Sequence, residues 1–207
     1  AGAGLPDGGL FTPDQFLRSS AGEPRPGQMP ARGAIEVKGA NENVFAVAET
    51  RQVQDYLRLY RQVLVTNYRE FLLVGYDHEG QPAKLESYRL ADDARSFWSA
   101  VAHPQKMAKE QGERLTEYLK RAMLRPVELV EPKDVAWFLA SYAREARARV
   151  EERKGLPELA AVRSALEEAL GMKFEGEKGE HFFRSTLVQT LFYGILSAFV
   201  LWDKHHK

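Results

Sequence analysis

The sequence predicts an α/β fold in which a central mixed sheet flanked by helices occupies residues 1–103 and an all-α helical segment occupies residues 104–207. Two observations predict this division. In the first part, short apolar or alternating runs lie between turn residues, which is typical of strands. Beyond His103, apolar residues recur every three or four positions, which is the period of a helix.

The first part is expected to contain two strands, a helix and three further strands. The five strands are expected near residues 8–12, 33–38, 63–66, 71–74 and 84–90, and the helix near residues 46–62. Residues 67–70 and 77–80 have the composition of tight turns between strands. Asn67 is interpreted as a turn former, with a contact to a phosphate as the alternative.

The strand at residues 33–38 carries charged side chains among apolar ones. Side chains alternate along a strand, so Ile35 and Val37 lie on one side and Glu36 and Lys38 on the other. We expect the apolar pair to anchor the strand in the core. The plain structural account of the charged pair is a solvated face of an edge strand.

The second part is expected to be a set of helices. Stripes of apolar residues predict helices around residues 115–123, 135–142, 157–171 and 180–202. The most apolar run, residues 187–202, is interrupted by polar residues and falls short of the roughly 18 apolar residues that a membrane span needs. We therefore expect a helix that is buried or docks on a partner, with no membrane. Part of its face should be exposed in this chain and favour self-association.

Composition excludes several classes of function. Lys plus Arg and Asp plus Glu are equal at 29 each, so any surface for nucleic acid must be a local patch. The absence of cysteine excludes disulfides, thiolate zinc sites and a cysteine nucleophile, and fits a cytoplasmic location. The chain begins without methionine, and we expect it to be part of a longer protein.

Three side chains near the predicted sheet suggest metal-dependent hydrolysis of a phosphodiester. Glu36 and Asp7 are candidate ligands for Mg²⁺, which prefers hard carboxylate oxygens. Lys38 shares a strand face with Glu36, where its ammonium group can hold the attacking water or offset charge on the phosphate. Asp14, which also follows a proline, is a rival for the role of Asp7.

The helix that follows this strand carries a second pair of polar residues. Gln52 and Tyr56 are four positions apart and share a helix face, from which they can orient Lys38 or contact the substrate backbone. Arginines on the same helix are candidate phosphate contacts: Arg51, Arg58 and Arg61.

These motifs resemble a known family. Pro6-Asp7, Ile35-Glu36-Val37-Lys38 and Gln52-x3-Tyr56, in this order, resemble the PD-(D/E)xK nuclease superfamily and its RecB-like branch. Residues 30–38, 63–71 and 182–193 are similar to the N-terminal region of bacterial single-chain restriction-modification proteins, in which a nuclease precedes an adenine-specific DNA methyltransferase.

The resemblance implies a Mg²⁺-dependent DNA endonuclease domain that acts on double-stranded DNA. It implies Asp7 and Glu36 as metal ligands, Lys38 as the catalytic lysine, and Gln52 and Tyr56 as further site residues. It also implies that residues 104–207 form a helical coupling segment leading to a methyltransferase domain absent from this chain. Two alternatives stay open: a repair or recombination nuclease of the same superfamily, and a catalytically silent module that binds nucleic acid or acts as a scaffold.

Overall fold

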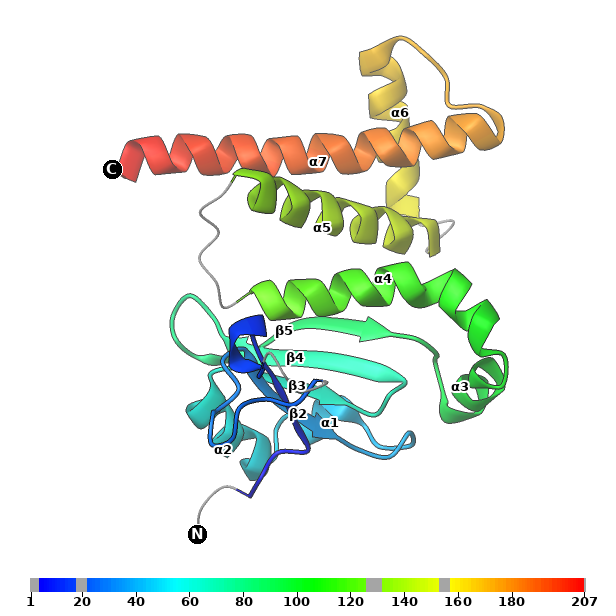
Figure 1. Ribbon diagram of the computed structural model, residues 1–207. Helices are drawn as coiled ribbons and strands as arrows, with labels where there is room; N and C mark the ends of the chain where they lie inside the picture. The colour runs from blue at the N-terminus through cyan, green and yellow to red at the C-terminus, as the bar shows by residue number, and fades with distance from the viewer. Residues whose placement is uncertain (1–3, 18–21, 126–131, 153–156, 207) are drawn as a thin grey trace. The chain divides into compact units, whose positions relative to one another are not determined.

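The chain forms two compact units in a computed structural model, Ala1–Glu128 (unit 1) and Leu129–Lys207 (unit 2). The structure describes residues 4–17, 22–125, 132–152 and 157–206 (Figure 1).

Unit 1 is built on a mixed sheet, as expected for an α/β fold. Its strands lie in the order β1 (Gly8–Leu10), β2 (Gly33–Val37), β3 (Val63–Thr66), β4 (Glu70–Tyr76) and β5 (Pro82–Arg89). Strands β2 and β3 are parallel, and the other neighbours are antiparallel. The α/β class predicted from the sequence is thus observed.

Two helices connect the parallel pair β2 and β3. Helix α1 (Val44–Val47) begins at Asn43, whose side chain accepts hydrogen bonds from the first backbone amides. Helix α2 (Arg51–Tyr60) begins at Thr50 and ends at Arg61, which adopts a left-handed conformation. A parallel pair needs a crossover connection of this kind, so the helices and the parallel register explain each other.

Gly33 fixes the start of β2 against Gln62, the residue that precedes β3. Its φ is +126°, and an added Cβ would lie 2.7 Å from the carbonyl oxygen of Gln62. Only glycine combines this backbone conformation with so close an approach. The next residue, Ala34, donates its backbone N–H to the same oxygen at 3.0 Å, which sets the register of β2 on β3.

Helices α1 and α2 lie on one face of the sheet and α4 lies on the other (Figure 1), and an apolar cluster lies between the sheet and the helices on each face. On one face, α1 and α2 pack against alternate residues of β3 and β4, including Val65 and Leu72. On the other face, Tyr118 and Ala122 of α4 (Pro104–Leu124) pack against Leu64 and Leu73. The side chains of β3 point alternately to these two covered faces, which explains why Val63, Leu64 and Val65 are all apolar.

Helix α4 belongs to unit 1, whereas the sequence analysis assigns residues 104–207 to the helical segment. The buried Arg121 of α4 forms an ion pair with Glu86 of β5 at 2.5 Å. A short helix, α3 (Ala94–Val101), precedes α4 and begins at an Asp93 cap that the sequence analysis does not anticipate. Together these contacts extend the sheet-containing unit to about residue 128.

Unit 2 is helical, with α5 (Pro132–Glu152), α6 (Pro157–Leu170) and α7 (Gly176–His206). Helix α7 packs along α5. Most of its large apolar side chains beyond residue 190 are exposed, as expected for a face left open in this chain, and of the two expectations the buried helix is not observed. Among the described residues, α7 alone is long and apolar enough to cross a membrane, which by itself is weak evidence for such a span.

Candidate active site at the end of strand β2

The register of the sheet places Asp7 beside β2, the strand that carries Glu36. Gly8 pairs with Ile35 in the antiparallel β1–β2 ladder, so Asp7 stands next to the end of β2 that carries Glu36 and Lys38. The Asp7 Oδ2 atom accepts a hydrogen bond from the backbone N–H of Val37 at 2.8 Å. Residues 30 positions apart in the sequence are thereby held at one edge of the sheet.

Glu36 is buried, contrary to the account of a solvated strand face. Its residue exposure is 1%, while Ile35 and Val37 are only half-buried. The reason lies in the register: Glu36 is paired with Val65, whose side chain belongs to the core beneath α1 and α2. Ile35 packs against the apolar cluster on the opposite face, as expected of an anchoring residue, but the most buried of these side chains is the charged Glu36.

The two carboxylate oxygens of Glu36 differ in their partners. The Oε1 atom accepts a hydrogen bond from the Lys38 ammonium group. The Oε2 atom is buried and has no hydrogen-bond donor among the described residues. A buried carboxylate oxygen without a donor is costly, and native structures supply such an atom with water or a cation.

Lys38 remains accessible beside the buried Glu36, with 28% of its side chain exposed. The hydrogen bond to Glu36 raises the pKa of the Lys38 ammonium group above its usual value of 10.5, against the opposing effect of burial. The negative charge of Asp7 contributes to the same rise. Lys38 is therefore a cation at neutral pH, accessible to an anion.

The two rival aspartates occupy different environments. Asp7 contacts β2 directly, as described above. Asp14 is exposed in a short 3-10 helix, Pro13–Gln15, and a hydrogen bond with Thr12 lowers its carboxyl pKa. Nearby Gln15 is buried and bonds back to Met29 and Ala31, so this turn is a structural brace. The geometry favours Asp7 as the acid that accompanies Glu36.

Gln52 and Tyr56 contact each other, and their further partner is Leu5 rather than the expected Lys38. The Gln52 side-chain amide donates to the Tyr56 hydroxyl at 2.9 Å, and that hydroxyl donates to the Leu5 carbonyl oxygen at 2.8 Å. Neither side chain bonds to Lys38 in the described part of the chain. The fully buried Tyr56 therefore positions the segment that leads into Asp7.

The arginines of α2 are held by local contacts. Arg51 and Arg58 both pair with Asp55, at 3.8 and 2.5 Å. The guanidinium of Arg61 lies 4.5 Å from the centre of the Tyr76 ring. The exposed Arg51 and Arg58 stay available to a phosphate, while Arg61 already has an aromatic partner.

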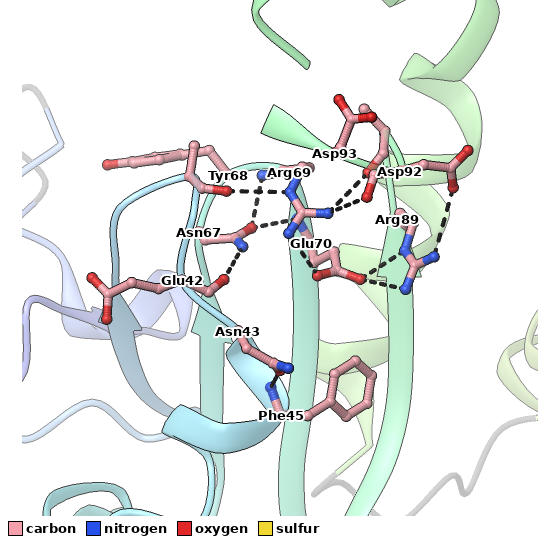
Figure 2. A network of polar contacts seen from close by, with 12 residues as sticks. Glu42, Asn43, Phe45, Asn67, Tyr68, Arg69, Glu70, Arg89, Asp92 and Asp93 are labelled. Atoms are coloured by element: carbon pink, nitrogen blue, oxygen red, sulfur yellow. Dashed lines mark hydrogen bonds and ion pairs between the residues drawn. The ribbon is translucent and has the colours of Figure 1, made fainter. Parts of the chain in front are cut away.

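The β3–β4 hairpin braces the loop that follows Lys38, and sequence reasoning missed this role (Figure 2). Lys38 donates its backbone N–H to Thr66 at 2.8 Å. The buried Asn67 donates its side-chain amide to the Glu42 carbonyl oxygen at 2.8 Å. Its side-chain oxygen accepts from the backbone amides of Arg69 and Glu70. The turn-former interpretation of Asn67 is thus confirmed, and it also anchors the loop beside Lys38.

The oxygen donors present fit a small hard cation. Glu36 Oε2 is an anionic oxygen without a donor, and Asp7 adds a second carboxylate at the same edge. Among the described residues, no group of three or more His, Cys, Asp or Glu side chains is arranged to hold a metal. Mg²⁺ is commonly bound by one or two carboxylates, with waters and substrate phosphates completing its coordination. Further acid-x-lysine triplets, at residues 131–133 and 152–154, lie partly outside the described residues.

No protein-family model, curated protein or solved structure gives a significant match to this chain. The resemblance to nucleases therefore rests on the sequence motifs alone.

Proposed function

We propose that unit 1 is a Mg²⁺-dependent DNA endonuclease domain of a bacterial restriction-modification protein, with the PD-(D/E)xK type of fold. The observation that carries the proposal is the buried Glu36, whose free Oε2 lies on the same carboxylate that Lys38 contacts, with Asp7 on the neighbouring strand. In an ion pair that is merely exposed on the surface, water hydrates both carboxylate oxygens. The buried Glu36 Oε2 lacks a donor, and a bound cation would supply its missing partner.

In this proposal, Asp7 and Glu36 hold Mg²⁺, which would act as a Lewis acid and lower the pKa of a bound water. The protein holds these two carboxylates on adjacent strands, and the hydrogen bond from Val37 fixes the orientation of Asp7. Tyr56 secures the preceding segment through Leu5. Such support keeps the ligands in place before the substrate arrives.

Lys38 acts in this proposal through its charge. Its raised pKa keeps the ammonium group protonated at neutral pH, so it cannot serve as the base that deprotonates water in this state. It would instead attract the scissile phosphate and stabilise the negative charge that develops there. Both roles expected from the sequence are compatible with a protonated group, because an ammonium group can hold a water by donating a hydrogen bond and can offset charge on the phosphate.

The helices of unit 2 form the proposed coupling segment to a methyltransferase domain. The support is the exposed apolar surface of α7, which includes Ile195, Phe199, Leu201 and Trp202. Exposed apolar patches of this kind mark surfaces for protein or membrane contact. The absence of a membrane partner stays a prediction, because α7 also satisfies the length and composition of a span.

The decisive test compares Lys38→Ala with wild type in Mg²⁺-dependent cleavage of supercoiled plasmid. Loss of a preorganised cation should slow cleavage by about 10²–10³-fold. Lys84→Ala is the matched control, because Lys84 also pairs with a glutamate in unit 1, Glu49, at 2.7 Å but outside the site. We expect Lys84→Ala to cleave like wild type. Equal cleavage by the Lys38 variant would remove this residue from the mechanism.

The alternatives predict different outcomes of the same assay. A repair or recombination nuclease would degrade linear DNA from its ends and leave closed circles uncut. A catalytically silent module would bind DNA without Mg²⁺-dependent cleavage. Glu36→Gln separates the silent module from the leading proposal. It removes an anionic metal ligand while keeping the shape of the side chain, so only in the leading proposal does it abolish a Mg²⁺-dependent cleavage that wild type shows.

A further inference from the structure

The tip of the β3–β4 hairpin presents an aromatic side chain in an unfavourable backbone conformation. Tyr68 has a φ of +64°, in the left-handed region. A bulky residue rarely adopts this strained region, and it persists there only where the surroundings impose it. The sequence favours Asn67 for such a position, yet it is the tyrosine that occupies it.

The surroundings of Tyr68 impose this conformation through a rigid polar network (Figure 2). The Thr66 hydroxyl accepts from the Tyr68 backbone N–H at 3.0 Å and donates to the Glu70 carbonyl oxygen at 2.8 Å. The Arg69 side chain donates to the Ala40 and Asp92 carbonyl oxygens at 3.3 and 2.6 Å.

The network continues into the sheet through a buried acid. Glu70 is buried and accepts from Arg89 at 2.6 Å, while its other oxygen lies 3.2 Å from Arg69. The backbone on either side of Tyr68 is therefore fixed from three directions: the strands, the loop after Lys38 and the segment before α3.

The Tyr68 side chain itself is free of this network. It is 58% exposed, and Figure 2 shows its ring pointing away from Arg69 and Glu70. Among the described residues, neither its ring nor its hydroxyl contacts a partner through an aromatic pair or hydrogen bond. Packing within unit 1 thus gives no reason for an aromatic residue at this strained position.

The position of Tyr68 relates it to the candidate site. Thr66, two residues earlier, accepts the Lys38 backbone N–H, and Asn67 holds the loop that leaves Lys38. The hairpin tip that carries Tyr68 thus follows directly on the strand that neighbours the candidate site.

We infer that Tyr68 is a DNA-contacting residue that stacks on a base beside the scissile phosphate. This inference rests on the proposed nuclease function and adds a contact that positions the DNA rather than a group in the chemical step. A rigid aromatic side chain has little conformational entropy to lose on stacking, and each base–aromatic stack contributes about 1–3 kcal/mol to binding. Aromatic or apolar wedges of this kind also open base steps in duplex DNA.

The test measures binding of the full chain to fluorescein-labelled duplex DNA by fluorescence anisotropy, with Ca²⁺ in place of Mg²⁺ to suppress cleavage. Tyr68→Gly should weaken binding by about 5- to 150-fold, the equivalent of one lost stack. Its melting temperature should equal or exceed that of wild type, because glycine relieves the left-handed strain. A purely structural role predicts the opposite pair of results, with lower stability and unchanged affinity.

Two variants control for the loss of the ring. Tyr68→Phe should bind like wild type, because stacking needs the ring and not the hydroxyl. Tyr193→Ala, which removes another exposed tyrosine in unit 2, should leave DNA affinity unchanged.

The outcomes separate this inference from the proposed function. Unchanged affinity of Tyr68→Gly, in a protein that cleaves plasmid through Lys38, overturns the Tyr68 contact and leaves the nuclease proposal standing. Binding that depends on Tyr68 without any Mg²⁺-dependent cleavage supports the contact and overturns the catalytic proposal. A wild-type chain that does not bind DNA overturns both.

Discussion

Apolar side chains are covered on both faces of the sheet in unit 1, whereas along much of α7 in unit 2 they face outward. Tyr56, Leu72 and Leu73 are almost wholly buried, while Leu201 and Trp202 are more than half exposed. Unit 1 therefore has a core of its own that can hold a precise site. The outer surface of α7 gains little from burial within this chain, and its exposed apolar side chains are the support for the proposed contact with a partner domain.

The polar contacts of the two units differ in the same sense. In unit 1, hydrogen bonds such as Tyr56 to Leu5 and Asn67 to Glu42 join segments far apart in the sequence. In unit 2, the described ion pairs are mostly between residues on one helix or on neighbouring helices, such as Arg149 with Glu145. Long-range polar contacts fix a tertiary arrangement, while contacts within one helix mainly support that helix.

The largest expected effect comes from truncating one leucine in each unit. Leu73→Ala removes a side chain with 0% exposure and should lower the free energy of unfolding by about 2–5 kcal/mol. Leu201→Ala removes one with 59% exposure and should change it by less than about 0.5 kcal/mol. Hydrogen exchange of peptides from β4 and α7 measures the two effects separately. Equal costs would show that the outer face of α7 is covered in solution, for instance by a second copy.

A smaller effect is expected from a single hydroxyl group in unit 1. Tyr56→Phe leaves the Leu5 carbonyl oxygen without its donor and should reduce the free energy of unfolding by about 1 kcal/mol. Tyr60→Phe is the control, since the Tyr60 hydroxyl has no hydrogen bond among the described residues. Denaturant unfolding and the exchange rates of β1 amides provide the measurement. Identical stability of the two variants would remove Tyr56 from its anchoring role.

The smallest effect concerns one lysine in each unit. Hydrogen bonds to glutamates raise the pKa of both Lys38 and Lys173 above 10.5. Because each folded-state pKa exceeds the unfolded one, the stabilisation is complete below about pH 10.5 and is lost as the pH rises through the folded value. The stability difference between wild type and Lys38→Met should therefore shrink above that pH.

The matched variant Lys173→Met should show a weaker version of the same trend, because its partner Glu167 is more accessible than Glu36. Denaturant midpoints from about pH 8 to about pH 11 provide the comparison. A difference between wild type and Lys38→Met that grows with pH would contradict the sign of the Lys38 pKa shift.

Much of the fold follows from local patterns in the sequence. The five strands and the turns at residues 67–70 and 77–80 lie close to the expected positions, and the single helix expected at residues 46–62 is divided into α1 and α2. Strand alternation and turn chemistry are local properties, so a single sequence carries them. Helix α3 was not predicted, because it is too short for its apolar residues to show a helical period.

The site was only partly predictable. The spacing of Glu36 and Lys38 places them together, but the burial of Glu36 depends on α1 and α2, which cover that face of the sheet. The Tyr56 contact with Leu5 and the Asn67 contact with Glu42 join distant segments, which no periodicity encodes. The assignment of α4 to unit 1 depends similarly on the buried ion pair of Arg121 with β5.

Strand β1 has three residues and lies at the edge of the sheet, and a long connection separates it from β2. Short edge strands detach at a lower free energy than the one required for global unfolding. Such a local opening would carry Asp7 away from Glu36 while the rest of the sheet stays folded. The fraction of molecules with both acids in place is therefore an equilibrium that a partner binding to β1 would shift.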